Sequence, residues 1–323
     1  MPGELGGALV AVLGGSGFVG SAVSARLAAR GARVRVVARN PGMPPFPAEV
    51  VAADLTEPGA VAAVVAGADV VLPLVLFTGG GSWRVADGDA ADAARVNVGI
   101  VAEAVAAARG SVVFAGSTSQ VGPGAPERID GTEADDPESE YDRQKCAAER
   151  LVLEAGGCSL RLPTVFGPSP GSPDRGVVTA MARRALAGEP LTVWGAGDAD
   201  RDLVFVEDVA EAFAAAVTHA DRLAGRAWLV GSGTGIAVRA LFELVASTVA
   251  ELTGRPAVPV LSVPPPPHAT ASDLRGLVAD PAGLTLATGW RAGVPLADAV
   301  SRTVAHVIGS SVDGGLPGTP NSG

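Results

Sequence analysis

Tyr141 is the only tyrosine in the chain of 323 residues, and Lys145 follows it in the stretch YDRQK. Residues four apart lie on one face of a helix, so the phenol and the ammonium would be neighbours. A free tyrosine has a pKa of about 10, and a nearby ammonium favours the phenolate and lowers that pKa. Such a tyrosine can pass a proton to a carbonyl oxygen while a nicotinamide supplies a hydride to the carbon. The alternative is an ordinary exposed helix pair, because this spacing often occurs by chance.

A glycine-rich turn near the N-terminus favours the cofactor chemistry over that alternative. Gly14, Gly17 and Gly20 follow an apolar run and lead into an alanine-rich segment typical of a helix. Glycine allows a tight turn and a close backbone approach, and a helix N-terminus presents N–H groups to a pyrophosphate. The strand-turn-helix context predicts a dinucleotide site and not a merely structural turn. The residues expected to contact the cofactor in this segment are Gly14, Ser16, Gly17, Phe18, Val19 and Gly20.

The residues after the next two expected strands indicate which dinucleotide binds. An acidic residue at the end of the second strand would bond the ribose 2′-hydroxyl of NAD, but this chain has Arg39 there. An arginine suits the 2′-phosphate of NADP, so the sequence predicts NADPH (NADP) as the cofactor. A solvated surface arginine is the alternative. Asp54 and Leu55 follow the third strand and are expected near the adenine, and Tyr141 and Lys145 complete the expected cofactor site.

The pattern of the first half of the chain predicts the elements that position these residues. From residue 8 to about 165, β-branched apolar runs alternate with alanine-rich stretches, which is typical of a parallel sheet covered by helices on both faces. Helices are expected to begin near Phe18, Gly59, Ala90 and Glu140. The expected strands are 9–13, 34–38, 50–53, 70–76, 112–116 and 159–162. The predicted fold class is α/β, a Rossmann-type doubly wound parallel sheet with a smaller C-terminal substrate-binding α/β lobe.

A change in texture after residue 165 predicts the domain organisation. Glycine- and proline-rich loops alternate there with helical stretches around 174–187, 207–219 and 237–252. We expect an NADP-binding domain over 1–165, to which about 202–232 returns, and a nucleotide-sugar lobe over 166–308. Residues 309–323 are expected to form a disordered tail because they are rich in glycine, serine and proline.

The composition excludes several classes of partner. The net charge of −10 argues against nucleic acid or an anionic membrane as the main partner, because both reward basic surfaces. The apolar run 60–78 is interrupted at Gly67 and Pro73, which favours a short helix and a buried strand over a membrane span. The two cysteines and three histidines lack metal-ligand spacing, so we expect no metal and no disulfide framework. These observations predict a cytoplasmic protein.

The motifs together resemble the extended short-chain dehydrogenase/reductases of the nucleotide-sugar epimerase/dehydratase type. The resemblance covers residues 8 to about 308, and it rests on SWRVADGD, RVNVG, GSTSQVG, YDRQK, LRLPTVFG, DRGVV and TGWRAGVPL. It implies that Ser117 holds the substrate carbonyl oxygen, that Lys145 anchors the cofactor ribose, and that Asn97 kinks its helix. The catalytic residues that it implies are Ser117, Tyr141 and Lys145. The substrate-binding residues that it implies are Ser117, Thr118, Thr164, Arg201 and Arg275, with the two arginines on the nucleotide diphosphate.

Departures from the family pattern narrow the expected reaction. Sugar 4,6-dehydratases carry an Asp-Glu pair where this chain has Thr118 and Ser119, so dehydration is not expected. The family usually has a histidine where Pro73 stands. The chain is similar to 4-ketoreductases of deoxysugar and antibiotic biosynthesis, which implies NADPH-dependent reduction of the C4 ketone of a dTDP-linked keto-deoxyhexose. The alternatives are an NAD(P)-retaining nucleotide-sugar epimerase and a non-catalytic NADP-sensing protein. A homodimer is expected from the resemblance alone.

Overall fold

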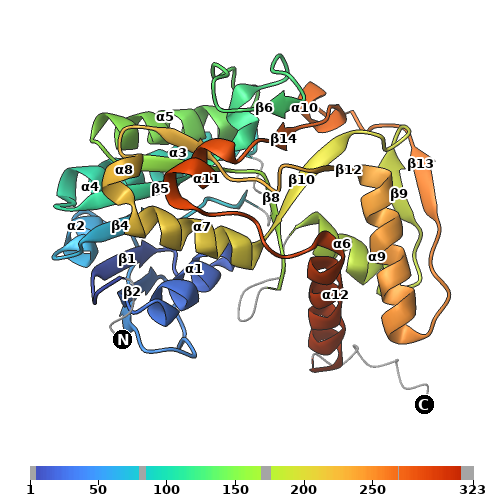
Figure 1. The fold of residues 1–323 in the computed structure, drawn as a ribbon, viewed down its shortest axis with the longest axis horizontal. Helices are drawn as coiled ribbons and strands as arrows, with labels where there is room; N and C mark the ends of the chain where they lie inside the picture. The colour runs from blue at the N-terminus through green and yellow to red at the C-terminus, as the bar shows by residue number, and fades with distance from the viewer. Residues whose placement is uncertain (1–4, 80–84, 169–175, 268, 314–323) are drawn as a thin grey trace.

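The protein has a large parallel sheet with helices on both faces and a smaller lobe beside it (Figure 1). This computed structural model describes residues 5–79, 85–168, 176–267 and 269–313. The first letters of SWRVADGD, at 82–84, and of DRGVV, at 174–175, therefore lie outside the described residues.

The central sheet has seven parallel strands in the order β11-β7-β5-β4-β1-β2-β3. The strands are β1 (Leu9–Leu13), β2 (Arg33–Ala38), β3 (Glu49–Ala52), β4 (Val70–Pro73), β5 (Ser111–Ser117), β7 (Cys158–Leu162) and β11 (Ala227–Leu229). The strand order reverses between β1 and β4, and ligands of doubly wound sheets bind in the crevice at that point. The predicted fold class is confirmed.

The residues of β1 show how the sheet is buried on both faces. Val10 and Val12 pack into one cluster with residues of α1 (Phe18–Ala29) and α7 (Val206–Thr218). Leu9, Ala11 and Leu13 pack into the opposite cluster. This second cluster includes residues of α2 (Ala60–Val65), α4 (Ile100–Ala107) and α5 (Glu140–Glu154). Successive strand residues point to opposite faces, so a strand covered on both sides is apolar throughout.

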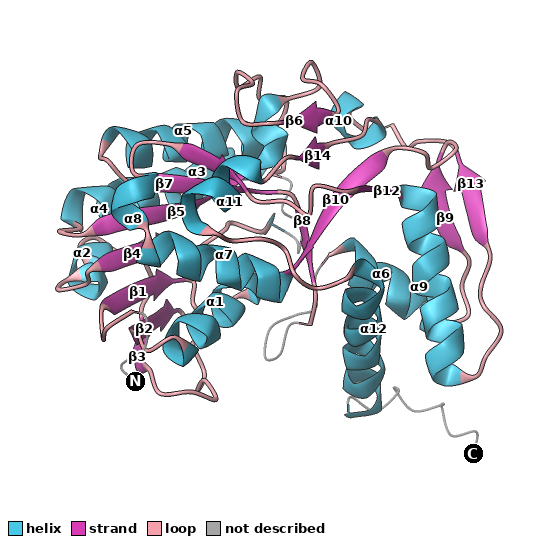
Figure 2. Ribbon diagram, in the orientation of Figure 1, coloured by secondary structure: helices cyan, strands magenta, loops and turns pink. Residues whose placement is uncertain are grey.

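The smaller lobe has its own core and joins the central sheet through β8 and β10. Its core lies among α6 (Val177–Leu186), α9 (Val238–Thr253), α12 (Leu296–Asp313), β8 (Thr164–Phe166), β9 (Leu191–Trp194) and β10 (Asp200–Phe205). Figure 2 shows β8 and β10 running from the side of the large sheet into this lobe. The remaining short strands are β6 (Arg128–Ile129), β12 (Gly235–Ala237), β13 (Val260–Val263) and β14 (Val278–Ala279).

Short helical segments connect these parts. They are η2 (Asp87–Asp89), α3 (Ala90–Ala94), η3 (Arg95–Gly99), η4 (Thr118–Val121), α8 (Ala220–Leu223), α10 (Ala271–Leu274) and α11 (Ala282–Thr288). Among the described residues, no helix has both the length and the apolar character needed to cross a membrane.

The structure differs from the sequence predictions at three main points. The strand expected over 70–76 ends at Pro73, and the N–H of Leu74 makes one last bond to the Leu13 carbonyl, at 2.8 Å, before the chain turns past the glycine-rich turn. A seventh strand, β11, pairs with β7. The helix α12 extends to Asp313, so the expected disordered tail is wrong for 309–313, because helix extension adds a hydrogen bond for each residue fixed. Residues 314–323 lie outside the described part.

Gly20 allows α1 to pack directly against the turn that precedes it. A Cβ atom at Gly20 would lie 2.1 Å from the Gly14 carbonyl oxygen. We expect Gly20→Ala to lower the free energy of unfolding by about 1 to 3 kcal/mol, because the helix must shift away from the turn. Urea denaturation measures the effect. The control is Gly309→Ala on the exposed side of α12, where a Cβ meets nothing within 4 Å and alanine is expected to stabilise the helix. Equal stability of Gly20→Ala and the wild type would contradict this account of Gly20.

Candidate active site

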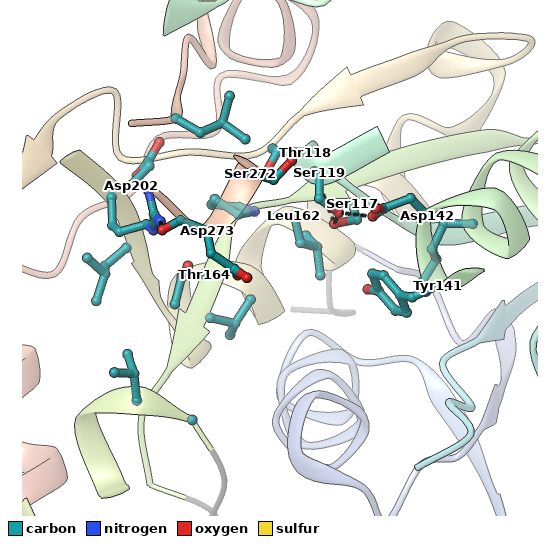
Figure 3. A pocket seen from close by; sticks show the side chains of 18 of the residues that line it. Ser117, Thr118, Ser119, Tyr141, Asp142, Leu162, Thr164, Asp202, Ser272 and Asp273 are labelled. Carbon is teal, nitrogen blue, oxygen red and sulfur yellow. Dashed lines mark hydrogen bonds between the residues drawn. The ribbon is translucent and has the colours of Figure 1, made fainter. Parts of the chain in front are cut away.

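A cavity of about 870 Å³ lies where the carboxyl end of the large sheet meets the smaller lobe. Its walls come from the end of β5, the first turns of α5, the loop after β4, and the elements β8, α6, β10 and α10. In Figure 3, Tyr141 and Ser117 lie toward one end of the view, and Asp202 and Asp273 lie toward the other. The cavity therefore joins the predicted catalytic residues to the predicted substrate lobe.

The glycine-rich turn fits a dinucleotide. Gly14 has φ +84°, and a Cβ there would lie 3.0 Å from the Leu74 carbonyl oxygen. Gly17 caps α1 without a side-chain hydrogen bond, so the first-turn N–H groups of this helix have no side chain over them. A backbone turn that no side chain fills, at the start of a helix of twelve residues, is the surface that a pyrophosphate requires. Phe18 and Val19 continue from this turn into the wall of the cavity.

The predicted adenine end is more exposed. Arg39 and Asp54 are both exposed, and the charge of Arg39 contributes to lowering the pKa of Asp54. The larger causes of that lowered pKa are the bonds that the Asp54 carboxylate accepts from the Thr56 hydroxyl, at 2.7 Å, and the Thr56 N–H, at 2.9 Å. Leu55 is buried in the core beside α2, so its side chain faces the protein interior.

The three predicted catalytic side chains come together at the junction of β5 and α5. Ser117 is the last residue of β5, and Tyr141 lies in the first turn of α5, close enough to Ser117 for the serine hydroxyl to affect the pKa of the phenol. The Lys145 ammonium donates a 2.7 Å hydrogen bond to the Ala115 carbonyl and lies 5.7 Å from the centre of the Tyr141 ring. All three side chains line the cavity.

The pKa values in this group differ from the sequence prediction. The prediction that Lys145 lowers the pKa of Tyr141 is wrong for this structure: desolvation raises that pKa to about 12, the nearby Ser117 hydroxyl opposes the rise, and the charge of Asp142 adds to it. Burial lowers the pKa of Lys145 to about 8, although Glu149 opposes this. Both shifts follow from desolvation, which disfavours the charged form of either group.

Asn97 distorts its helix in the way that the resemblance implies. The segment η3 is a single π-helical turn centred on this residue, between α3 and α4. Asn97 is buried, and its side-chain oxygen accepts a 2.8 Å bond from the Phe77 N–H. Its side-chain NH₂ group donates a 2.7 Å bond to the Gln144 side chain. Asn97 thereby ties the loop after β4, which lines the cavity, to the helix of Tyr141.

The sequence analysis missed the polar groups that hold Ser117. The Ser117 N–H donates to the Gln120 side chain at 2.8 Å, and the Gln120 amide donates to the buried Glu149 at 3.2 Å. Glu149 forms a buried ion pair with Arg161 at 2.5 Å. This hydrogen-bonded network, in which the two charges are paired, therefore holds the end of β5 in position.

Ser119 and Asp142 were also missed. The Ser119 hydroxyl lies 2.7 Å from the Ser117 hydroxyl and donates a 2.5 Å bond to the Asp142 carboxylate. One sequence signal could have revealed Asp142: the spacing Ser139-x-x-Asp142 at a helix start, which is that of a capping box.

The two predicted phosphate-binding arginines line the far side of the cavity. Arg201 donates to the backbone carbonyls of Asp273 and Arg275. Arg275 donates to the backbone carbonyls of Gly122 and Pro126, and both of these bonds are 2.6 Å long. Burial lowers the pKa of Arg201. Both guanidinium groups thus hold the wall segment around α10 in place. Thr118 and Thr164 line the same cavity, as the resemblance implies.

The sequence model of the NAD dependent epimerase/dehydratase family matches residues 10–231. The chain belongs to this family. Its relatives include a dTDP-6-deoxy-L-talose 4-dehydrogenase (NAD(P)(+)) of Kitasatospora kifunensis, which is 35% identical over 259 residues, 74% of this chain and 78% of the relative. This family includes enzymes that act on nucleotide sugars, as the name of this relative states.

Two solved structures of this family share the fold. MoeE5 in complex with UDP-glucose and NAD is 27% identical, with a TM-score of 0.79, over 94% of this chain and 99% of that one. The UDP-glucose 4-epimerase of Thermus thermophilus in complex with NAD is also 27% identical, with a TM-score of 0.76, over 94% of this chain and 100% of that one. The fold and the glycine-rich turn of the present chain therefore belong to a nicotinamide-dependent family.

The lowered pKa of Lys145 predicts a pH-dependent effect on stability. Between about pH 8 and 10.5, the unfolded chain binds a proton at Lys145 that the folded protein lacks, so the free energy of unfolding rises with pH. Relative to Lys145→Met, we expect the wild type to gain roughly 2 to 3 kcal/mol between pH 7 and pH 10. Urea denaturation at both pH values measures the difference. A constant difference between the two proteins would show that Lys145 stays charged in the folded state.

Proposed function

We propose that the protein is an NADPH-dependent 4-ketoreductase that reduces the C4 ketone of a dTDP-4-keto-6-deoxyhexose. The observation that carries this proposal is the half-buried Tyr141 phenol, beside Ser117 and close to Lys145, at the end of a cavity that reaches two arginines. A proton donor at one end and cationic groups at the other match a keto sugar joined to a diphosphate.

The residues of the chain account for each part of the reaction except the hydride, which a bound nicotinamide supplies to the carbonyl carbon. As that carbon becomes tetrahedral, negative charge develops on the oxygen, and the Tyr141 phenol gives its proton to this oxygen. The Ser117 hydroxyl lies beside the phenol, where it would hold the carbonyl oxygen at the point at which the proton is delivered. The apolar walls at Leu74, Val75 and Leu162 exclude water from the reacting carbon.

The other binding roles follow from position. Lys145 lies between the Tyr141 ring and the sheet, where its ammonium would anchor the cofactor ribose. Arg201 and Arg275 would exchange their backbone carbonyl partners for the diphosphate, because charge-assisted bonds to phosphate are stronger than bonds to neutral carbonyls. Thr118 and Thr164 offer hydroxyls to the sugar between these two ends.

The relative from Kitasatospora kifunensis supports the choice of substrate, because its name describes the oxidation of a dTDP-linked 6-deoxyhexose at C4, which is the reverse of the proposed reaction. Deoxysugar formation for antibiotics and other natural products, in the cytoplasm, is the setting that we propose. A homodimer is part of this proposal and rests on the family resemblance alone.

An NAD(P)-retaining nucleotide-sugar epimerase is the second candidate function, because the chain shares its fold with the UDP-glucose 4-epimerase of Thermus thermophilus. An epimerase oxidises and re-reduces one sugar without net use of cofactor. Net consumption of NADPH therefore distinguishes the two reactions, and binding of NADPH without either reaction would indicate a sensor.

The proposed reaction predicts stoichiometric oxidation of NADPH by a dTDP-4-keto-6-deoxyhexose. We expect Tyr141→Phe to lower kcat by about 10²- to 10⁴-fold, because the phenol proton is lost while the ring is kept. Loss of NADPH absorbance measures turnover, and the circular dichroism spectrum controls for folding. Wild-type protein that leaves NADPH unchanged, or full turnover by Tyr141→Phe, would refute the proposal.

The position of Arg39 predicts the choice of cofactor. We expect Arg39→Ala to raise the KM for NADPH about tenfold or more and to leave the KM for NADH unchanged, because only NADPH carries the 2′-phosphate that the guanidinium would bind. Initial rates with each cofactor measure the ratio. Arg33→Ala, at the opposite end of β2, is the matched control and should change neither value. An equal effect of Arg39→Ala on both cofactors would show that Arg39 does not recognise the phosphate.

A further inference from the structure

Residues 270–275, which we call the α10 wall, form one side of the cavity. Thr270, Ser272, Asp273 and Arg275 of this segment line the cavity. Figure 1 shows α10 near β6 and β14, at the top of the view. Two sets of contacts attach this wall to other parts of the cavity, and a bound diphosphate would affect them differently.

The first set of contacts uses the predicted phosphate-binding arginines. The Arg201 guanidinium donates to the carbonyls of Asp273 and Arg275 and so attaches the wall to β10. The Arg275 guanidinium donates to the carbonyls of Gly122 and Pro126 and so attaches the wall to the loop after η4. A diphosphate bound by both guanidinium groups competes for the same N–H donors. Its binding would therefore loosen the wall against which it lies.

The second set of contacts comes from Glu138, whose carboxylate bridges two N–H groups at the start of α10. One oxygen accepts the Ala271 N–H at 3.3 Å, and the other accepts the Ser272 N–H at 3.2 Å. The first N–H groups of a helix have no partner within it, so Glu138 satisfies donors that α10 itself leaves unpaired. Neither bond involves a guanidinium group. These contacts can therefore persist when the arginines change partners.

The place of Glu138 in the chain makes this bridge relevant to the chemistry. Glu138 directly precedes Ser139, the N-cap of α5, and Tyr141 lies three residues further on. The Glu138 carbonyl also accepts a 3.3 Å bond from Arg143 of the same helix. The carboxylate therefore attaches the α10 wall to the start of the helix that carries the phenol. A ligand held between the two is kept in register with Tyr141.

We propose that Glu138 is a positioning residue that keeps the α10 wall against the start of α5 after a diphosphate has taken Arg201 and Arg275. The sugar is thereby held beside Tyr141. This inference rests on the proposed function for the presence of a diphosphate at the two arginines. Its consequence is that Glu138 is needed in the bound protein and is dispensable in the free protein, where the arginines hold the wall. A glutamate that only stabilised the fold would be needed equally in both states.

A spin label on the α10 wall measures this difference without turnover. Leu274 is 49% exposed and is not among the described residues that line the cavity, so Leu274→Cys offers a thiol for labelling. The native cysteines, Cys146 and Cys158, react little at neutral pH, because burial raises the pKa of each thiol to about 12. The electron paramagnetic resonance spectrum then reports the mobility of the wall with and without dTDP.

Glu138→Gln is the test variant, because it keeps the length of the side chain and removes the bridge. The glutamine NH₂ group can only donate, so it cannot accept from an N–H group. With Glu138 present, we expect an immobile label in both states. In Glu138→Gln, we expect the label to be immobile in the free protein and mobile at saturating dTDP. If dTDP binds this variant and leaves its spectrum unchanged, whether mobile or immobile, the inference is overturned.

Glu133→Gln is the matched control. The Glu133 carboxylate also bridges two N–H groups, those of Asp130 and Gly131, each at 3.0 Å, and it lies outside the described lining of the cavity. We expect Glu133→Gln to leave the label immobile with and without dTDP. A response equal to that of Glu138→Gln would show a general loosening of the chain before α5, and the specific role of Glu138 would be rejected.

A further comparison replaces the ligand by substitutions and so separates this inference from the proposed function. In the double variant Arg201→Ala, Arg275→Ala, we expect Glu138 to keep the label immobile, and adding Glu138→Gln should make it mobile without any ligand. The circular dichroism spectrum controls for folding. An immobile label in the triple variant would overturn the inference. A mobile label there, together with a wild type that does not bind dTDP in calorimetry, would reject the proposed function and keep the role of Glu138.

Discussion

The approach of the Tyr141 phenol to the Ser117 hydroxyl is the contact around which the site is arranged. It joins the first turn of α5 to the last residue of β5. Each partner is fixed independently, Ser117 by Gln120 and the buried pair of Glu149 with Arg161, and the start of α5 by the capping box of Ser139 with Asp142. A side chain delivers its proton at a defined point only if the elements that carry it are held rigidly. Here both the end of β5 and the start of α5 are held by buried polar contacts.

The fold and the conformation of the glycine-rich turn could be predicted because their causes are largely local. A strand covered on both faces is apolar throughout, and β1 with its neighbours follows that rule. Gly20 is required by its contact with the Gly14 carbonyl, six residues earlier in the chain, and Gly14 by its φ of +84°. The Tyr141–Lys145 spacing placed both residues on one helix face for the same reason. Where the cause was not local, as for α12 beyond residue 308, composition gave the wrong boundary.

The electrostatics of the site could not be predicted, because they depend on burial and on partners distant in the sequence. The spacing predicted that Lys145 would lower the pKa of Tyr141, whereas burial raises it. Ser119 and Asp142 lie 23 residues apart in the chain and meet only in the folded protein. Arg201 has a carbonyl partner 74 residues away in the sequence, and Arg275 has one 153 residues away. Residue types therefore predicted the candidate catalytic side chains, and the fold determined the direction of their pKa shifts.

The raised pKa of Tyr141 is compatible with a donor role because of the base that receives the proton. An alkoxide that forms on the substrate carbon is a stronger base than any phenolate, so proton transfer from Tyr141 remains favourable even at a pKa of about 12. The same high pKa keeps the phenol protonated between turnovers. A site that began its cycle by removing a proton from an alcohol would need the phenolate, which burial disfavours here. The raised pKa of this phenol thus matches the reductive direction of the proposed reaction.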